Sequence, residues 1–134
     1  LNEWGARFSP DGRWLAFSSN ESGREEVYVA PFPGPGGKWQ ISTNEGDRPR
    51  WSPDGRQIYY LDNEDRICVV DVDGSGQGLS VGRMDVLFSV SALRPSNIFE
   101  LMGDGQRFLV NERLTDLDDS MIVVVQNWSR ELVD

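Results

Sequence analysis

Short apolar runs of four or five residues, separated by polar turn residues, recur along the chain. The runs are rich in aromatic and β-branched residues, a composition typical of buried strands. No stretch combines helical periodicity with capping residues. The pattern therefore predicts an all-β chain, with strands at 14–18, 27–30, 39–42, 57–61, 67–70, 86–89, 107–111 and 121–125.

A turn motif precedes three of these strands. The sequence Phe-Ser-Pro-Asp-Gly-Arg at 8–13 returns as Trp-Ser-Pro-Asp-Gly-Arg at 51–56, and a weaker copy, Leu-Met-Gly-Asp-Gly-Gln, occupies 101–106. Asp11 and Asp54 lie 43 residues apart, and Asp54 and Asp104 lie 50 apart. The first interval matches the period of four-stranded propeller blades, about 40–45 residues, and the second is somewhat longer.

The residues of the motif have a mechanical role. Proline fixes φ at about −65° for the first central position of a turn, and the Asp side chain accepts hydrogen bonds from nearby backbone N–H groups. Gly12 and Gly55 are expected to take the left-handed conformation that closes a hairpin with a bulge. Each turn would join an inner strand, at 6–8 or 48–51, to the strand that follows. The third copy lacks the proline.

The repeats predict a single domain over residues 1–134. It would consist of three four-stranded antiparallel meanders, the third short of its outer strand. The segments 31–37 and 71–78, rich in Gly or Pro, are predicted loops between the third and fourth strands of the first two meanders. The three units are expected to span about 1–43, 44–90 and 91–134.

Composition narrows the classes of function. The 134 residues hold 13 Lys and Arg against 22 Asp and Glu, a net charge of −9. That balance argues against nucleic acid and against an anionic membrane surface as partners. No apolar run approaches the roughly 20 residues of a spanning helix. With no histidine and a single cysteine, Cys68, Ser-His-Asp and Cys-His catalysis and an internal disulfide are excluded.

Candidate metal chemistry gathers in one segment. The sequence Asp-Val-Asp-Gly-Ser-Gly at 71–76 resembles the start of a calcium loop, with oxygen donors at Asp71, Asp73 and Ser75. Its twelfth position is Gly82, where a bidentate Glu belongs, so a Gly-rich hairpin turn is the favoured interpretation. The acidic segment 116–119 is interpreted as a solvated loop. We predict no catalytic, cofactor-binding or metal-binding residue.

Other candidate residues are better explained by structure than by chemistry. Cys68 lies inside an apolar strand and is expected to be a small buried hydrophobe. An aspartate that recurs once per repeat is more typical of turn formation than of catalysis, and Asp11, Asp54 and Asp104 are interpreted in this way. For the aromatic residues, packing between repeats is the favoured interpretation, and an aromatic ligand platform is the alternative. These residues are Trp14, Trp39, Trp51, Tyr59, Tyr60 and Phe108.

The repeated motif and the apolar strand after it resemble the WD40-like repeats of TolB-type β-propellers. The segments 2–42 and 122–128 are similar to the C-terminal propeller part of bacterial multidomain proteins, often serine/threonine kinases. The resemblance implies a propeller fold and a role as a scaffold or binding surface. No kinase residue is carried over, because the chain has no His-Arg-Asp and no Asp-Phe-Gly sequence.

The expected function is therefore a non-catalytic scaffold or protein-interaction module, without a cofactor. The alternatives are the accessory propeller of a peptidase-like enzyme, or ligand or ion binding in a central channel. Three blades cannot close a ring, since closed propellers hold about four to eight. We expect a homodimer that closes a six-bladed ring, or a chain that is part of a longer one, and the two are compatible because such a part can dimerise to cover its faces.

Overall fold

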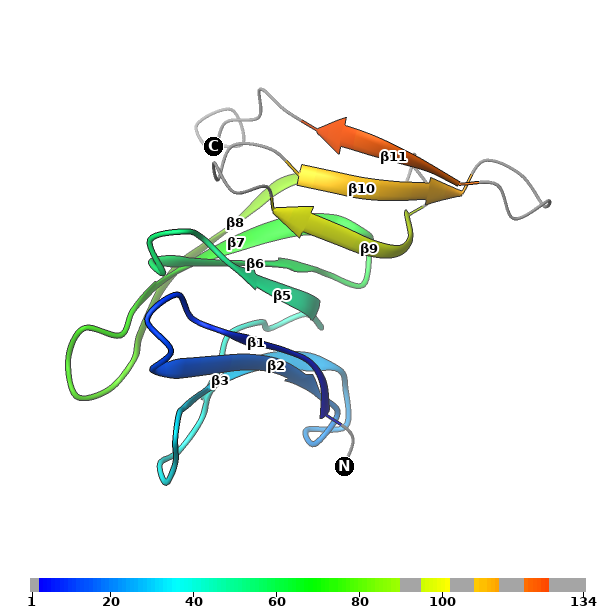
Figure 1. The fold of residues 1–134 in the computed structure, drawn as a ribbon. Coiled ribbons are helices and arrows are strands. Elements are labelled where there is room, and N and C mark those ends of the chain that lie inside the picture. The colour runs from blue at the N-terminus through cyan, green and yellow to red at the C-terminus, as the bar shows by residue number, and fades with distance from the viewer. Residues whose placement is uncertain (1–2, 90–94, 102–107, 114–119, 126–134) are drawn as a thin grey trace.

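The computed structural model describes residues 3–89, 95–101, 108–113 and 120–125, with side chains described for residues 5–89. Every regular element in these ranges is a strand (Figure 1). The described residues contain no helix, and so none that is long and apolar enough to cross a membrane. The predicted all-β class is confirmed.

The strands form three antiparallel meanders in chain order. The first sheet holds β1 (Glu3–Phe8), β2 (Trp14–Ser19), β3 (Glu26–Pro31) and β4 (Trp39–Gln40). The second holds β5 (Asp47–Trp51), β6 (Gln57–Leu61), β7 (Arg66–Asp73) and β8 (Ser80–Ser89). The third holds β9 (Pro95–Leu101), β10 (Phe108–Arg113) and β11 (Ser120–Val125).

The sheets stack in the order of the chain (Figure 1). Strand β5 contacts β1, β2 and β3 of the first sheet, and β9 of the third. The two inner strands share an irregularity, because the pairing register shifts between Trp4 and Arg7 in β1 and between Asp47 and Arg50 in β5. Gly5 and Arg48 occupy matching places in these bulges, both with positive φ. The repeat in the sequence is thus a repeat in backbone geometry.

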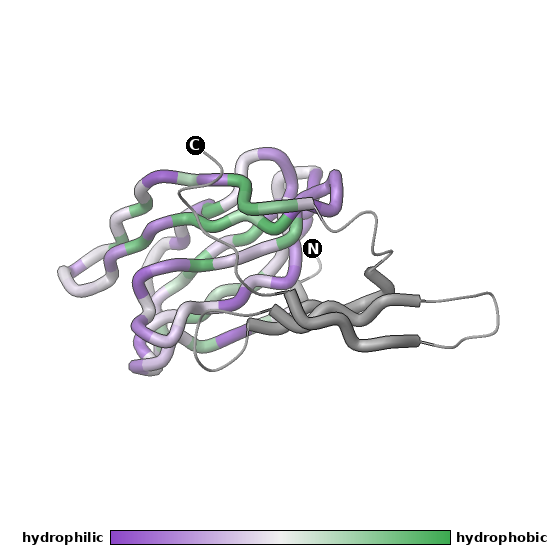
Figure 2. Tube along the Cα trace, turned by 90° about the horizontal axis from the view of Figure 1, so that it is seen from above, coloured by the Kyte–Doolittle hydropathy of each residue, from purple (hydrophilic) through white to green (hydrophobic). Residues whose placement is uncertain are grey.

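The core lies in the seam between the first and second sheets. Alternate residues of each strand point into it, and the buried hydrophobic side chains of the two sheets meet there in one cluster. Figure 2 shows hydrophobic stretches within the strands and hydrophilic ones at several turns. The first sheet contributes Trp14, Ala16, Val27, Val29 and Ile41, and the second contributes Ile58, Tyr60, Cys68, Val70, Val72 and Leu79.

Some predicted strand ends differ from the structure. The outer strand predicted at 86–89 begins at Ser80, and β7 continues to Asp73, so the predicted loop at 71–78 starts later. The cause is pairing: Val72 and Asp73 pair with Val81 and Ser80 across a long outer hairpin. In the first sheet, β4 covers only Trp39–Gln40.

Candidate functional site

The two complete turn motifs form the same hydrogen-bond pattern. Ser9 Oγ donates to Asp11 Oδ1 at 2.7 Å and accepts the N–H of Trp14 at 3.1 Å. The N–H of Arg13 donates to the same Asp11 oxygen at 3.0 Å. Gly12 closes the turn with its N–H on the Ser9 carbonyl at 2.9 Å and has φ +75°. These are the roles that the sequence predicts for the Asp and Gly positions.

The second turn repeats these bonds. Ser52 Oγ donates to Asp54 Oδ1 at 2.7 Å and accepts the N–H of Gln57 at 3.1 Å, while the N–H of Arg56 donates to Asp54 at 3.0 Å. Gly55 has φ +74°. Donated hydrogen bonds favour the charged carboxylate. The bond from Ser52 therefore lowers the pKa of Asp54, as does the bond from the N–H of Arg56.

The two turns lie on one groove of about 870 Å³, which we call the turn groove. The loop between β7 and β8 forms its third wall. Arg13 Nη2 lies 3.5 Å from the carbonyl oxygen of Gly76, and Trp14 Nε1 donates to that of Gly74 at 3.3 Å. The outer hairpin of the second sheet is thereby attached to the first. The charged lining of the groove consists of Asp11, Arg13, Asp54, Arg56, Asp71 and Asp73.

The calcium-like segment 71–76 covers the last residues of β7, which ends at Asp73, and the start of the hairpin loop that leads to β8. Asp73 Oδ1 accepts both the N–H and the hydroxyl of Ser75, at 2.9 and 2.6 Å, and these bonds lower the pKa of Asp73. Gln57 Nε2 donates to Asp71 Oδ1 at 3.3 Å. Within the described ranges, no group of three or more acidic or cysteine side chains is placed to hold a metal ion. The segment 116–119 lies outside the described residues.

The aromatic candidates pack between and within the sheets. Trp14, Tyr59 and Tyr60 are buried, and the ring of Trp39 meets that of Trp14 edge to face at 5.6 Å. Trp51 is half-buried against the seam, and its Nε1 donates to the carbonyl of Arg7 at 2.9 Å. Packing therefore accounts for these five rings. Phe108 and Asp104 lie outside the described side chains.

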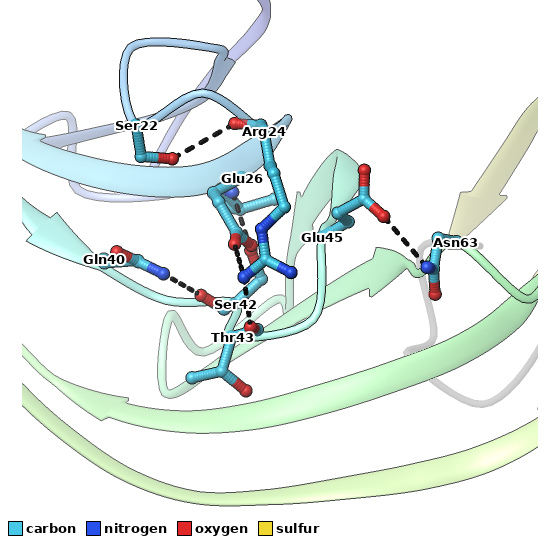
Figure 3. Close-up of polar contacts among 9 residues, drawn as sticks. Ser22, Arg24, Glu26, Gln40, Ser42, Thr43, Glu45 and Asn63 are labelled. Atoms are coloured by element: carbon cyan, nitrogen blue, oxygen red, sulfur yellow. Dashed lines mark hydrogen bonds and ion pairs between the residues drawn. The ribbon is translucent and has the colours of Figure 1, made fainter.

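A buried polar cluster at the opposite end of the seam is missing from the sequence-based predictions. Glu26 is 1% exposed, and its carboxylate accepts the hydroxyl of Ser42 at 2.6 Å and Nη2 of Arg24 at 3.4 Å. Figure 3 shows Arg24 reaching both Glu26 and the carbonyl of Thr43. The Ser42 hydroxyl also accepts the N–H of Val27 at 2.8 Å. The bonds to Ser42 and Thr43 hold β3 and the residues before it against the segment that follows β4.

The turn carboxylate of Asp62 lies beside Cys68. Asp62 Oδ1 accepts the N–H groups of Glu64 and Arg66 at 2.9 Å, and Asp62 Oδ2 accepts Nε of Arg66 at 2.8 Å. Cys68 Sγ lies 3.7 Å from Asp62 Oδ2. Burial, reinforced by the nearby Asp62 charge, raises the pKa of the Cys68 thiol to about 12. The thiol is therefore protonated at neutral pH and a poor nucleophile, consistent with the predicted buried hydrophobe.

Carboxylates crowd the start of β5. Burial, together with the nearby Asp47 carboxylate, raises the pKa of Glu25 to about 7, while Arg48 opposes the shift and Glu45 adds to it. Asp47 Oδ1 accepts the hydroxyl of Ser18 at 3.2 Å and the N–H of Arg48 at 2.8 Å. Glu25 also accepts the N–H of Gly46 at its carbonyl, at 2.9 Å. This cluster joins the first two sheets, and its member Glu25 titrates near neutrality.

Solved structures with similar backbones show which fold class these stacked sheets belong to. An oligogalacturonate lyase from Vibrio parahaemolyticus matches with a TM-score of 0.67 at 16% identity, over 89% of this chain and 35% of the lyase. TolB from Acinetobacter baumannii matches with 0.64 at 18%, over 94% and 30%. A TolB-type protein from Agrobacterium tumefaciens matches with 0.60 at 19%, over 95% and 46%. The sheets are β-propeller blades.

We call the sheet β1–β4 blade 1, the sheet β5–β8 blade 2 and the sheet β9–β11 blade 3. The chain spans between 30% and 46% of the length of these three propeller proteins. No family model and no curated protein matches it by sequence. At identities below 20% the likeness concerns the fold alone.

Proposed function

We propose that this chain is a non-catalytic propeller module that binds another protein at the turn groove. The repetition of the groove's turns supports this proposal. Asp11 and Asp54 accept the same bonds in successive blades. A catalytic group acts at one place in a site, whereas a structural group recurs with each repeat. The carboxylates that line the groove at both turns thus have a structural task in their own blade.

The reactive groups of the described side chains support the same proposal. The hydroxyls of Ser9 and Ser52 each donate to a turn aspartate. The pKa of both Asp11 and Asp54 is lowered, so each carboxylate is a weak base for activating the serine. The Cys68 thiol is buried and protonated. One structural neighbour is an oligogalacturonate lyase, which makes eliminative cleavage of that substrate the activity to test first.

The purified chain is the right material for an activity test. We expect no turnover of oligogalacturonate, measured by the ultraviolet absorbance of an unsaturated product. We also expect no cleavage of an unstructured protein such as casein. The matched control is Arg56→Ala, which removes a charged side chain of the groove. Turnover by the wild type that this variant loses would overturn the non-catalytic assignment.

The groove favours a basic partner segment. Its lining sets four carboxylates against the two guanidinium groups of Arg13 and Arg56, and the whole chain carries a charge of −9. Opposite charge on the partner raises the association rate, and added salt weakens this electrostatic attraction. Trp51, half-buried at the groove, offers an intrinsic fluorescence signal.

A peptide titration tests this preference. A short Lys-rich peptide is expected to change Trp fluorescence and to bind more weakly in about 0.5 M salt, whereas a Glu-rich peptide of the same length is not expected to bind. Asp54→Asn keeps an acceptor oxygen for the turn while removing the charge, so it should weaken binding without unfolding blade 2. Equal binding of both peptides, or of neither, contradicts the proposal.

We further propose that the module belongs to the C-terminal region of a larger bacterial protein, where it acts as a sensor or docking part. The support is the resemblance of residues 2–42 and 122–128 to the propeller region of multidomain serine/threonine kinases. The fraction of each structural neighbour that the chain spans is compatible with a partial ring. Sequencing the source DNA on both sides of this coding region tests the assignment, and the absence of a kinase or comparable domain contradicts it.

A further inference from the structure

The seam between blades 1 and 2 shows how one blade of this chain covers another. Blade 2 turns Ile58, Tyr60 and Val72 toward blade 1, and these side chains are at most 5% exposed. Trp51 packs at the edge of the same cluster and donates its indole N–H to Arg7 of blade 1. The face of blade 2 that carries these residues is therefore covered by the blade before it.

Blade 1 has a matching face on its far side. Trp14 and Ala16 point into the seam, so the residues between and after them, Leu15 and Phe17, point away from blade 2. By the repeat, Leu15 and Phe17 correspond to Ile58 and Tyr60 of blade 2. Figure 1 shows blade 1 at one end of the stack. We call this side of blade 1 its outer face.

The outer face carries an exposed aromatic pair. Phe8 and Phe32 are 54% and 48% exposed, and their rings meet edge to face at 4.8 Å. Phe8 corresponds to Trp51 in the turn motif. Phe32 corresponds to Val72, because each donates its N–H to the carbonyl of the motif arginine, at 2.8 and 2.9 Å. Phe8 and Phe32 are thus exposed in blade 1, whereas the corresponding Trp51 and Val72 of blade 2 pack against blade 1.

The exposed apolar surface of the outer face is the Phe8–Phe32 pair, and the rings beside it are already buried within blade 1. The rings of Phe17 and Tyr28 stack at 6.0 Å and are buried. Lys38 lies over the Tyr28 ring at 5.7 Å and forms an ion pair with Glu21 at 2.6 Å. An exposed aromatic pair beside charged side chains matches the apolar centre and polar rim of a protein interface.

We propose that the outer face of blade 1 binds blade 3 of a second copy of this chain. The proposal rests on the propeller-module assignment above. The stack is directional: blade 1 covers blade 2, and β9 of blade 3 lies beside β5 of blade 2. The two ends of one stack therefore correspond to the two sides of a seam. A two-fold axis between two copies would pair each end with the other and form two equal seams.

The number of blades fits this arrangement. Each copy contributes two four-stranded sheets and one three-stranded sheet in its described ranges, so two copies supply six. Six lies within the range of about four to eight blades in closed propellers. The two seams together should bury more than about 2,000 Å², the size of an obligate dimer interface.

Light scattering coupled to gel filtration tests the dimer on this chain of 134 residues. At micromolar concentration we expect twice the chain mass of 15.1 kDa. Phe8→Glu places a charge on the outer face and is expected to weaken dimerisation at least tenfold, giving monomer at the same concentration. Met84→Glu is the matched control, since Met84 is 42% exposed on the outer strand β8 and should leave the mass unchanged. A monomeric wild type overturns the proposal, as does an unchanged mass for Phe8→Glu.

A labelling experiment covers the case in which Phe8→Glu does not fold. Because Cys68 is buried and its thiol pKa is about 12, a cysteine introduced as Phe8→Cys is the reactive thiol for a maleimide. The dimer predicts slow labelling at high protein concentration and at least tenfold faster labelling on dilution. A rate independent of concentration overturns it. Neither result bears on the activity and peptide tests, so failure of the dimer is distinguishable from failure of the binding module.

Discussion

Ser52 has two bonding roles at the residue scale, since its hydroxyl donates to Asp54 and accepts the N–H of Gln57. The hydroxyl is buried. Ser52→Ala should lower the free energy of unfolding by about 1–3 kcal/mol, because it leaves a backbone N–H without its partner. Denaturant melts measure the change. Ser80→Ala, at an exposed position, is the control and should have little effect; equal losses in the two variants would contradict the turn's role.

Glu25 makes stability depend on pH near neutrality. Its pKa is about 7 in the folded chain against an ordinary 4.5, so between these values the folded chain holds a proton that the unfolded chain lacks. The free energy of unfolding should therefore fall as pH rises from about 4.5 to 7. Glu25→Gln should flatten this dependence. Above pH 7 it should stabilise the protein, because it removes a charge that burial and Asp47 disfavour. The gain should be at most about 1 kcal/mol, since solvent screens a half-buried carboxylate.

Denaturant melts of the wild type and of Glu25→Gln across this pH range measure the difference between their free energies of unfolding. The groups that face Glu25 are Asp47, Glu45 and Arg48, which the substitution leaves in place. The other carboxylates of the chain titrate in both proteins and cancel in the comparison. Parallel pH profiles for Glu25→Gln and the wild type would contradict the assignment.

Residue roles were predictable where the partners are neighbours in the chain. Ser9, Asp11 and Gly12 lie within four residues, so Asp and Gly roles follow from composition and turn chemistry. Glu26 was not predictable, because its partner Ser42 lies sixteen residues away. In the sequence, Glu26 stands in a charged run that looks solvent-exposed. Burial of such a group depends on which segment the register places beside it.

Element geometry at the turns depends on glycine. Gly12 has φ +75°, and a Cβ added there would have open space within 4 Å. The cost of Gly12→Ala is therefore a backbone cost, about 1–2 kcal/mol for an L-residue in the left-handed region. Thermal melts should show this loss. Gly76→Ala, also in open space but without a left-handed φ, should be neutral, and a loss of the same size there would refute the explanation.

The existence of the strands was easier to predict than their ends. Strands β2 and β6 carry apolar side chains on both faces of their blades and form short apolar runs, so their limits were clear from the sequence. Strand β8 was underestimated because most of its first residues, from Ser80 to Met84, are exposed and show no apolar pattern. Its length comes from pairing with β7, which is a property of the partner strand.

At the scale of the whole molecule, the seam should dominate stability. Ile58 is fully buried in it, and Ile58→Ala should cost about 2–5 kcal/mol through lost burial and a residual cavity. Val81→Ala, on the exposed outer strand, should change stability by less than about 0.5 kcal/mol. Denaturant melts of both variants measure the difference. Similar losses would show that the seam contributes no more than the outer strand.

The stacking of blades could be predicted from the spacing of the motif. The turn groove could not be predicted from it. The 43-residue interval between Asp11 and Asp54 indicated one blade per repeat, but nothing in either motif indicated that the β7–β8 loop closes the space between them. That loop was predicted as a turn within its own repeat. Its contact with Trp14 joins positions sixty residues apart, a distance at which pattern analysis has no signal.

That contact has an evolutionary consequence. Tandem duplication of one repeat copies the turn with its bonds intact, since Ser9, Asp11 and the N–H of Trp14 lie within six consecutive residues. The indole of Trp14 reaches instead into the following repeat, at Gly74, and the copied position there is Gln57. A ring that grows by duplication thus inherits its turns ready-made, while each outer hairpin must adapt afterwards to the side chain that its predecessor presents.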